Sequence, residues 1–148
     1  SAMFAMEALE KAGEYDVLLT FMRSIFRPMV RRDATTFWEV LSDELNDEGW
    51  PTRSHCHGWS GHPIHFLNRI VLGIMPTEPG RKAFVISPRP SGLEWAEGSS
   101  GSLRGPVSVR WAIEGERMTI DVSAPDGVSV SYRPNDELEN LDVTFSVE

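Results

Sequence analysis

The chain contains 148 residues, enough for one compact domain or two small ones. Hydrophobic residues make up 41% and charged residues 24% of the chain, a balance typical of globular rather than disordered proteins. The formal net charge of -8 argues against nucleic acid as a partner, because phosphates require a basic surface. The single cysteine, Cys56, cannot form a disulfide within the chain, and no run of about 18 apolar residues predicts a membrane-spanning segment.

The first half of the chain carries apolar residues at helical spacing. One stripe over residues 4–12 and a second over residues 18–29 predict two helices, and Gly13 is suited to end the first, so that the pair forms an antiparallel hairpin. Pro28 should end or kink the second helix around Arg27. A third helix is predicted after Pro63, ending at Gly73. Three helices of this length rarely bury both faces of a hairpin. We therefore expect a fragment of a larger helical array, whose exposed apolar faces drive a homodimer or a helix swap as a result of truncation.

After Met75 the pattern changes to alternation between apolar and polar residues. It predicts strands at residues 83–86, 93–96, 107–113, 118–122, 128–132 and 143–147, with turns between several of them. Trp95 and Trp111 are expected to fill the core, whereas the Gly/Ser-rich residues 98–105 are expected to form a mobile loop. The predicted class is α+β, with the last helices of a larger helical domain at residues 1–75 and a small antiparallel β-sandwich at residues 76–148.

Residues 35–39, Thr-Thr-Phe-Trp-Glu, place a carboxylate directly after two aromatic side chains. Such a pair suits a sugar site, because an aromatic ring packs on the apolar face of a pyranose. The apolar wall of Trp38 can also raise the pKa of Glu39 toward general acid or base duty. The same residues fit a helix start, in which Thr35 or Thr36 is the N-cap and Glu39 completes a capping box.

The second candidate stretch is residues 54–60, Ser-His-Cys-His-Gly-Trp-Ser. Zinc needs four well-spaced ligands, and His55, Cys56 and His57 are too close together to share one ion. A Cys–His nucleophile pair needs a separate base and an oxyanion site. A histidine that hydrogen-bonds a sugar hydroxyl or orients a carboxylate fits the chemistry better, and a buried histidine at a helix entry is the alternative. The acidic run at residues 43–48 lacks EF-hand spacing and is predicted to be a solvated loop. We expect neither a metal nor a cofactor.

These two motifs resemble those of bacterial α-L-rhamnosidases, glycoside hydrolase family 78. Residues 35–39 resemble that family's Thr-Thr-aromatic-Trp-Glu motif, and residues 54–60 its Ser-His-Cys-His-Gly-Trp-Ser motif. Further stretches match in the same order, at residues 4–13, 72–80, 84–88 and 93–96. The resemblance implies an (α/α)6 barrel that ends near residue 75, followed by an accessory β domain. It also implies inverting hydrolysis of terminal α-L-rhamnosides, in which the acid and base carboxyl groups lie ~6.5–9.5 Å apart.

The resemblance implies that Glu39 is the general base and that His57, or its near neighbour His55, contacts the sugar. Trp38 and Trp59, which lie in the same motifs, are further sugar-binding candidates. The family's general acid lies on upstream loops, so the 148 residues alone are expected to be inactive while the parent is an enzyme. The implied partners are rhamnose-containing glycans or glycosides. The alternative function is a carbohydrate-binding or purely structural β-sandwich module.

Overall fold

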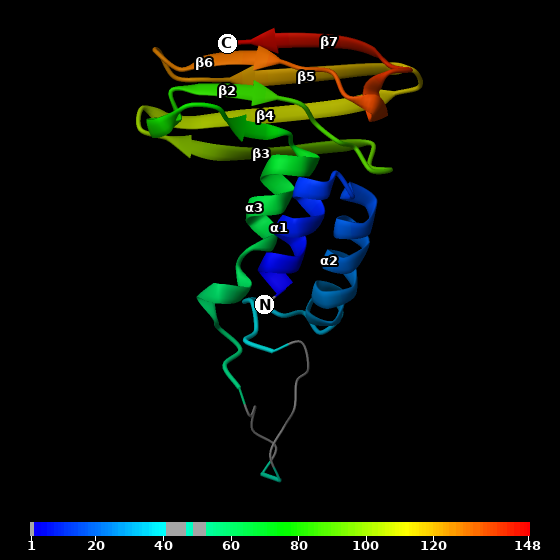
Figure 1. Cartoon of the computed structure of the whole chain (residues 1–148), viewed down its shortest axis with the longest axis vertical. Helices are drawn as coiled ribbons and strands as arrows, with labels where there is room; N and C mark the ends of the chain where they lie inside the picture. Colours follow the sequence, from blue (N-terminus) through cyan, green and yellow to red (C-terminus); the bar gives the residue numbers. More distant parts are fainter. Residues whose placement is uncertain (1, 41–46, 49–52) are drawn as a thin grey trace. The chain divides into compact units, whose positions relative to one another are not determined.

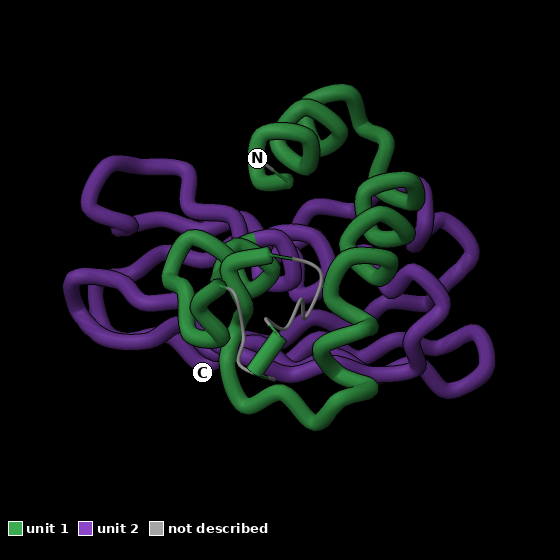
Figure 2. The backbone as a smooth tube through the Cα atoms, turned by 90° about the horizontal axis from the view of Figure 1, so that it is seen from below, with its two compact units in different colours: residues 1–65 green, residues 66–148 purple. Residues whose placement is uncertain are grey.

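The computed structural model of the chain (Figure 1) describes residues 2–40, 47–48 and 53–148. Most of the predicted acidic loop, including Asp43 and Glu44, lies outside the described residues, as does Trp50. The chain forms two compact units, residues 1–65 and residues 66–148 (Figure 2). Among the described residues, no helix combines the length and the hydropathy needed to cross a membrane.

The first unit begins with the predicted helical hairpin. Helices α1 (Ala2–Ala12) and α2 (Tyr15–Val30) pack against each other, and Gly13 turns the chain between them with φ of +76°, a conformation that favours glycine. Pro28 does not end α2 at Arg27, which was one of the two predicted outcomes, because the helix continues to Val30. Pro28 keeps a helical φ and removes only its own N–H, so the last turn continues through it. The buried side chains of the hairpin include Met6, Leu18, Leu19, Met22, Ile25 and Met29.

The third predicted helix is confirmed as a helical segment, but it is not uniformly α-helical. A short 3-10 turn, η1 (Gly58–Ser60), precedes α3 (Pro63–Phe66). Directly after α3 the chain widens into a π-helical turn, η2 (Leu67–Val71). Gly73 then leaves the helix with φ of +69°, as expected for the residue that ends it.

The second unit contains two sheets. One sheet has the order β1-β2-β6, formed by β1 (Ile74–Pro76), β2 (Ala83–Ile86) and β6 (Ser129–Tyr132). The other has the order β3-β4-β5-β7, formed by β3 (Trp95–Ser102), β4 (Gly105–Glu114), β5 (Arg117–Ser123) and β7 (Asp142–Val147). Two 3-10 turns, η3 (Pro79–Arg81) and η4 (Asp136–Leu138), lie in the connections. This α+β arrangement agrees with a small β-sandwich.

The predicted purely antiparallel pairing is wrong for two strand pairs. β2 pairs with β6 in parallel, and β5 pairs with β7 in parallel, whereas the β1-β2, β3-β4 and β4-β5 pairs are antiparallel. A tight hairpin forces antiparallel neighbours. After β5, however, the chain crosses to the other sheet and then returns as β7, so these two strands are free to join an edge in either direction.

The expected mobile loop at residues 98–105 is mostly a strand. β3 runs to Ser102 and pairs with β4 along its full length. Glycine at position 98 permits a close approach, since a Cβ there would lie 2.5 Å from Cδ1 of Leu72. The side-chain amide of Asn68 donates a hydrogen bond to the carbonyl of Ser99 at 3.1 Å. Pairing with β4 and these contacts therefore override the weak strand propensity of Gly and Ser.

The core of the second unit lies between the two sheets. Trp111 is fully buried, as predicted, and its indole Nε1–H donates a hydrogen bond to the carbonyl of Val71 at 2.9 Å. The rings of Tyr132 and Phe145 stack with centroids 5.5 Å apart, which joins β6 to β7. Burial raises the pKa of Tyr132. The remaining buried strand residues are Ile74, Phe84, Ile86, Val107, Val109, Met118, Ile120 and Val122.

Trp95 does not belong to this core. Its side chain is 55% exposed, so the expectation that it fills the sandwich is wrong. The strand register gives the reason, because Trp95 pairs with Ala112 whereas Ala96 pairs with Trp111. Neighbouring residues of a strand point to opposite faces, so Trp95 lies on the outer face of the sheet that buries Trp111.

An arginine clamp fastens the segment that leads into β3. The guanidinium of Arg89 contacts the carboxylates of Asp136 at 2.7 Å and Glu137 at 3.3 Å, and it holds the pKa of Asp136 below its usual value. Glu137 also accepts a hydrogen bond from the backbone N–H of Ser91 at 2.8 Å. The amide of Asn135 donates to the carbonyl of Pro88 at 2.9 Å. These contacts fix the chain where it passes between the two sheets.

The two tryptophans of the second unit provide a matched test of the core. We expect Trp111→Phe to lower the free energy of unfolding by about 2–4 kcal/mol, because it leaves a cavity and a buried carbonyl at Val71 without its donor. Trp95→Phe on the exposed face should change it by less than about 0.5 kcal/mol. Urea denaturation of both variants measures the difference, and equal losses would contradict this assignment of inside and outside.

Two glycines with similar positive φ separate steric contact from backbone strain. Gly73 has φ of +69°, and an added Cβ would lie 2.2 Å from the backbone nitrogen of Pro88. Gly115 has φ of +63° with no atom within 4 Å of such a Cβ. Gly115→Ala should cost about 1–2 kcal/mol through strain alone, and Gly73→Ala about 1–3 kcal/mol more through overlap. Thermal unfolding of the two variants tests this order.

Candidate functional site

The two candidate motifs of the first unit lie side by side. The backbone N–H of Glu39 donates to the carbonyl of Ser54 at 2.8 Å, and the N–H of His57 donates to the carbonyl of Phe37 at 2.8 Å. These bonds join two irregular segments that are separated in the sequence. Residues 35–39 contain no helix, so the capping-box interpretation of Glu39 is wrong. The capping-box pattern does not produce a helix here, because pairing with residues 54–57 uses the backbone groups that a helix would need.

The carboxylate of Glu39 is exposed and held from one side. Its Oε2 accepts a hydrogen bond from the backbone N–H of Ser54 at 3.2 Å. The hydroxyl of Ser54 donates to the carbonyl of Cys56 at 2.8 Å and accepts from the N–H of Cys56 at 3.1 Å. These two bonds tighten the turn that presents the backbone N–H of Ser54 to Glu39. A hydrated carboxylate with a fixed orientation is suited to accept a proton from a water molecule.

The side chain of Trp38 packs against His55 and leaves Glu39 in contact with solvent. The indole of Trp38 is buried and stacks on the imidazole of His55, with ring centroids 4.5 Å apart and an interplanar angle of 16°. The hydroxyl of Thr36 donates to the carbonyl of His55, which fixes the same residue through its backbone. Nε2 of His55 is buried and has no hydrogen-bond partner within the described ranges 2–40, 47–48 and 53–148. Trp38 therefore acts on the site through His55.

His57 and Trp59 form an aromatic pair that faces solvent. Their ring centroids are 5.8 Å apart at an interplanar angle of 70°. The indole of Trp59 is 87% exposed, an unusual position for a large apolar side chain. The N–H of Ser60 donates to the carbonyl of His57 at 3.0 Å, which begins η1 and fixes this pair on the loop. An exposed indole beside an imidazole offers a sugar both a stacking surface and a hydrogen-bonding group.

A second aromatic contact fixes the loop on helix α2. The ring of Phe26 lies 5.8 Å from that of Phe37 and 5.4 Å from that of His62, in edge-on geometry both times. Nδ1 of His62 lies 3.1 Å from the carbonyl of Trp59. The sequence did not single out Phe26, because it lies off the apolar stripe of its helix, nor Ser54 as the residue that orients Glu39. The Thr36–Phe37 stretch also borders a small hollow of about 180 Å³ beside Met29 and Val30.

Metal binding receives no support from the part of the chain that the structure describes. Those residues contain no group of three His, Cys, Asp or Glu side chains that could hold an ion. Cys56 is exposed and its thiol is free. The chemistry that the arrangement offers is therefore that of one oriented carboxylate, two imidazoles and an exposed indole.

Comparison with known proteins bears on the second unit most directly. Residues 73–140 match the family described as the bacterial alpha-L-rhamnosidase C-terminal domain. Over these residues, the chain is similar to the rhamnosidase C-terminal domain. The resemblance to glycoside hydrolase family 78 that the motifs indicate is confirmed. Glu39 and the other site residues lie outside residues 73–140, so the family match by itself does not cover them.

Relatives of the chain are much longer than it is. An alpha-L-rhamnosidase of Alteromonas sp. (strain LOR) is 27% identical over 138 residues, which are 86% of this chain and 15% of that protein. The GH78 family rhamnosidase of Bacillus sp. GL1 superposes with a TM-score of 0.81 and 30% identity over 99% of this chain and 16% of its own. The Streptomyces avermitilis alpha-L-rhamnosidase complexed with L-rhamnose superposes with a TM-score of 0.59 and 27% identity. The match covers 70% of this chain and 10% of that protein. The chain thus spans about a sixth or less of these rhamnosidases.

Proposed function

We propose that the chain is the C-terminal part of an inverting glycoside hydrolase that removes terminal α-L-rhamnosyl residues, and that Glu39 is its general base. One observation carries the proposal. The pairing of residues 37–39 with residues 54–57 puts an exposed carboxylate, which accepts a backbone hydrogen bond from Ser54, close in the chain fold to the His57–Trp59 pair. The rhamnosidase C-terminal domain and the names of the relatives support the substrate class.

The helices of the first unit would then belong to an (α/α)6 barrel. Similarity to the Bacillus rhamnosidase extends over 99% of the chain, which includes these helices as well as the sheets. Several apolar side chains of α1 and α2 are exposed, among them Phe4, Val17 and Val30. Further helices of the parent would cover such positions, because exposed apolar surface is costly in water.

In the proposed mechanism, the carboxylate of Glu39 takes a proton from a water molecule while the oxygen of that water attacks the anomeric carbon. The bond to the leaving-group oxygen breaks, and a carboxylic acid on the opposite side protonates that oxygen. His57 hydrogen-bonds a sugar hydroxyl and Trp59 stacks on the ring. The stacked side chains of Trp38 and His55 keep both motifs in place. The acid must come from another part of the parent, because one carboxyl group cannot perform both proton transfers.

Replacement of Glu39 in the full-length parent tests the base assignment. Glu39→Gln keeps the shape and the hydrogen bond from Ser54 but loses the basic oxygen. We expect kcat for an aryl α-L-rhamnoside to fall by about 10²–10⁴-fold. Glu116→Gln, which makes the same chemical change in an exposed hairpin turn of the second unit, is the matched control and should keep wild-type rates. Equal rates for Glu39→Gln and the wild type would refute the role of Glu39.

Two further readouts complete this experiment. Inversion requires that the first product of the parent, followed by NMR, is β-L-rhamnose, and α-L-rhamnose would exclude the inverting mechanism. Trp59→Ala should raise KM more than it lowers kcat if the indole binds the sugar in ground state and transition state alike. The 148-residue chain alone should show no turnover in the same assay.

A further inference from the structure

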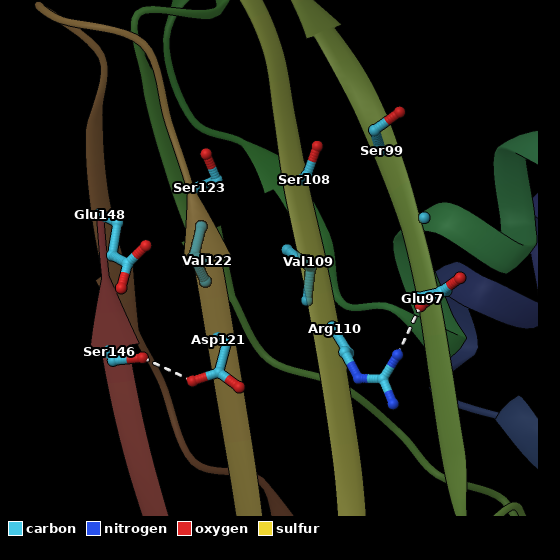
Figure 3. A pocket seen from close by; sticks show the side chains of 11 residues that line it. Glu97, Ser99, Ser108, Val109, Arg110, Asp121, Val122, Ser123, Ser146 and Glu148 are labelled. Atoms are coloured by element: carbon cyan, nitrogen blue, oxygen red, sulfur yellow. Dashed lines mark hydrogen bonds and ion pairs between the residues drawn. The ribbon is translucent and has the colours of Figure 1, made fainter.

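The outer face of the four-stranded sheet forms a second polar surface, far in sequence from Glu39. Alternation along β3, β4, β5 and β7 turns one set of side chains away from the core. These side chains, together with parts of the backbone, line a shallow hollow of about 530 Å³ (Figure 3). Its polar side chains are Glu97, Ser99, Ser108, Arg110, Asp121, Ser123, Ser146 and Glu148.

These side chains form two rows across the strands (Figure 3). One row is made of hydroxyls from Ser99, Ser108 and Ser123. The other is charged and internally bonded. Arg110 donates to Glu97 at 2.8 Å, and the hydroxyl of Ser146 donates to Asp121 at 2.7 Å. The hollow therefore presents a row of hydroxyls beside a row of hydrogen-bonded donors and acceptors.

Trp95 lies on the same face, next to the charged row. It precedes Glu97 by two residues in β3, about 6.6 Å along a strand. The guanidinium carbon of Arg110 lies 5.9 Å from the centre of its ring. More than half of the indole is exposed, whereas Trp111, which pairs with the adjacent Ala96 on the inward face, is fully buried. The arrangement is an aromatic platform at the edge of a polar hollow.

The charges of the hollow restrict its ligand. Three carboxylates, of Glu97, Asp121 and Glu148, stand against the one guanidinium of Arg110, so the surface repels polyanions such as nucleic acids or uronate-rich polymers. A metal ion is disfavoured because the described residues contain no suitable cluster of three ligands. A protein partner would require an apolar centre, whereas Trp95 stands among polar side chains.

We propose that this face binds a neutral glycan. Trp95 stacks on the apolar face of one pyranose, while Arg110 and Asp121 exchange hydrogen bonds with the hydroxyls of the next sugar in the hollow. The spacing between Trp95 and the hollow favours a chain of at least two sugars over a single sugar. This inference does not rest on Glu39, so it can fail or succeed independently of the proposed hydrolase activity.

Affinity electrophoresis of the 148-residue chain tests the proposal. Native gels are cast with a soluble neutral rhamnan, with galactomannan, or with polygalacturonate as the anionic comparison. We expect at least one neutral polymer to retard the chain and polygalacturonate to leave it unretarded. Trp95→Ala should weaken the retardation about tenfold or more, whereas Trp95→Phe, which keeps an aromatic face, should retain most of it.

Two control variants distinguish binding at this face from non-specific binding to the polymer. Leu103→Ala removes an apolar side chain that is 83% exposed elsewhere in the same unit, and it should migrate like the wild type. Asp121→Asn should weaken binding about threefold to tenfold, while Asp126→Asn removes an equal charge from an exposed turn and should not. If thermal unfolding shows that Trp95→Ala is misfolded, the Asp121 and Asp126 pair decides.

Several results would overturn the proposal. These are no retardation by either neutral polymer, retardation that Trp95→Ala and Asp121→Asn leave unchanged, or stronger retardation by polygalacturonate than by the neutral polymers. Loss of retardation with Glu39→Gln or Trp59→Ala, but not with Trp95→Ala, would assign the binding to the first unit instead.

Discussion

The buried indole of Trp111 fixes the faces of the larger sheet. Its hydrogen bond to the carbonyl of Val71 joins β4 to the end of η2, and its bulk must lie between the sheets because nowhere else can it leave water. Once Trp111 points inward, Arg110 on the same strand must point outward. The pairing of β3 with β4 then carries Trp95 to the outer face as well. A slip of one residue would exchange the core and the polar hollow.

In the first unit, backbone pairing between distant segments has the corresponding role. The bonds from Glu39 to Ser54 and from His57 to Phe37 bring two motifs together, and the Trp38–His55 stack fills the space behind them. As a result the carboxylate accepts a backbone hydrogen bond while it stays exposed to solvent. That combination suits a base that acts on water, whereas a carboxyl group that must donate a proton is better served by burial.

The two proposals assign different tasks to the two units. Glu39 would act on the bond that breaks, and the Trp95 face would bind another part of the glycan. A second attachment point raises the effective concentration of a polymeric substrate without any change in the chemical step. Small aryl rhamnosides would gain nothing from it, so the two activities can be separated by choice of substrate.

Periodicity and motifs in the sequence determined several features by themselves. The helical stripes and Gly13 predict the α1–α2 hairpin, the alternation around Trp111 predicts β4, and the order of the motifs indicates the rhamnosidase family. These features are local, so neighbouring residues carry the whole signal. Other features depended on partners far along the chain. Only the tertiary structure decided that residues 98–102 form a strand, that β6 and β7 join in parallel, and that residues 35–39 pair with residues 54–57. Trp95 shows the reason most directly, because a period of two says that neighbours face opposite sides, but only the register with β4 says which side is the core.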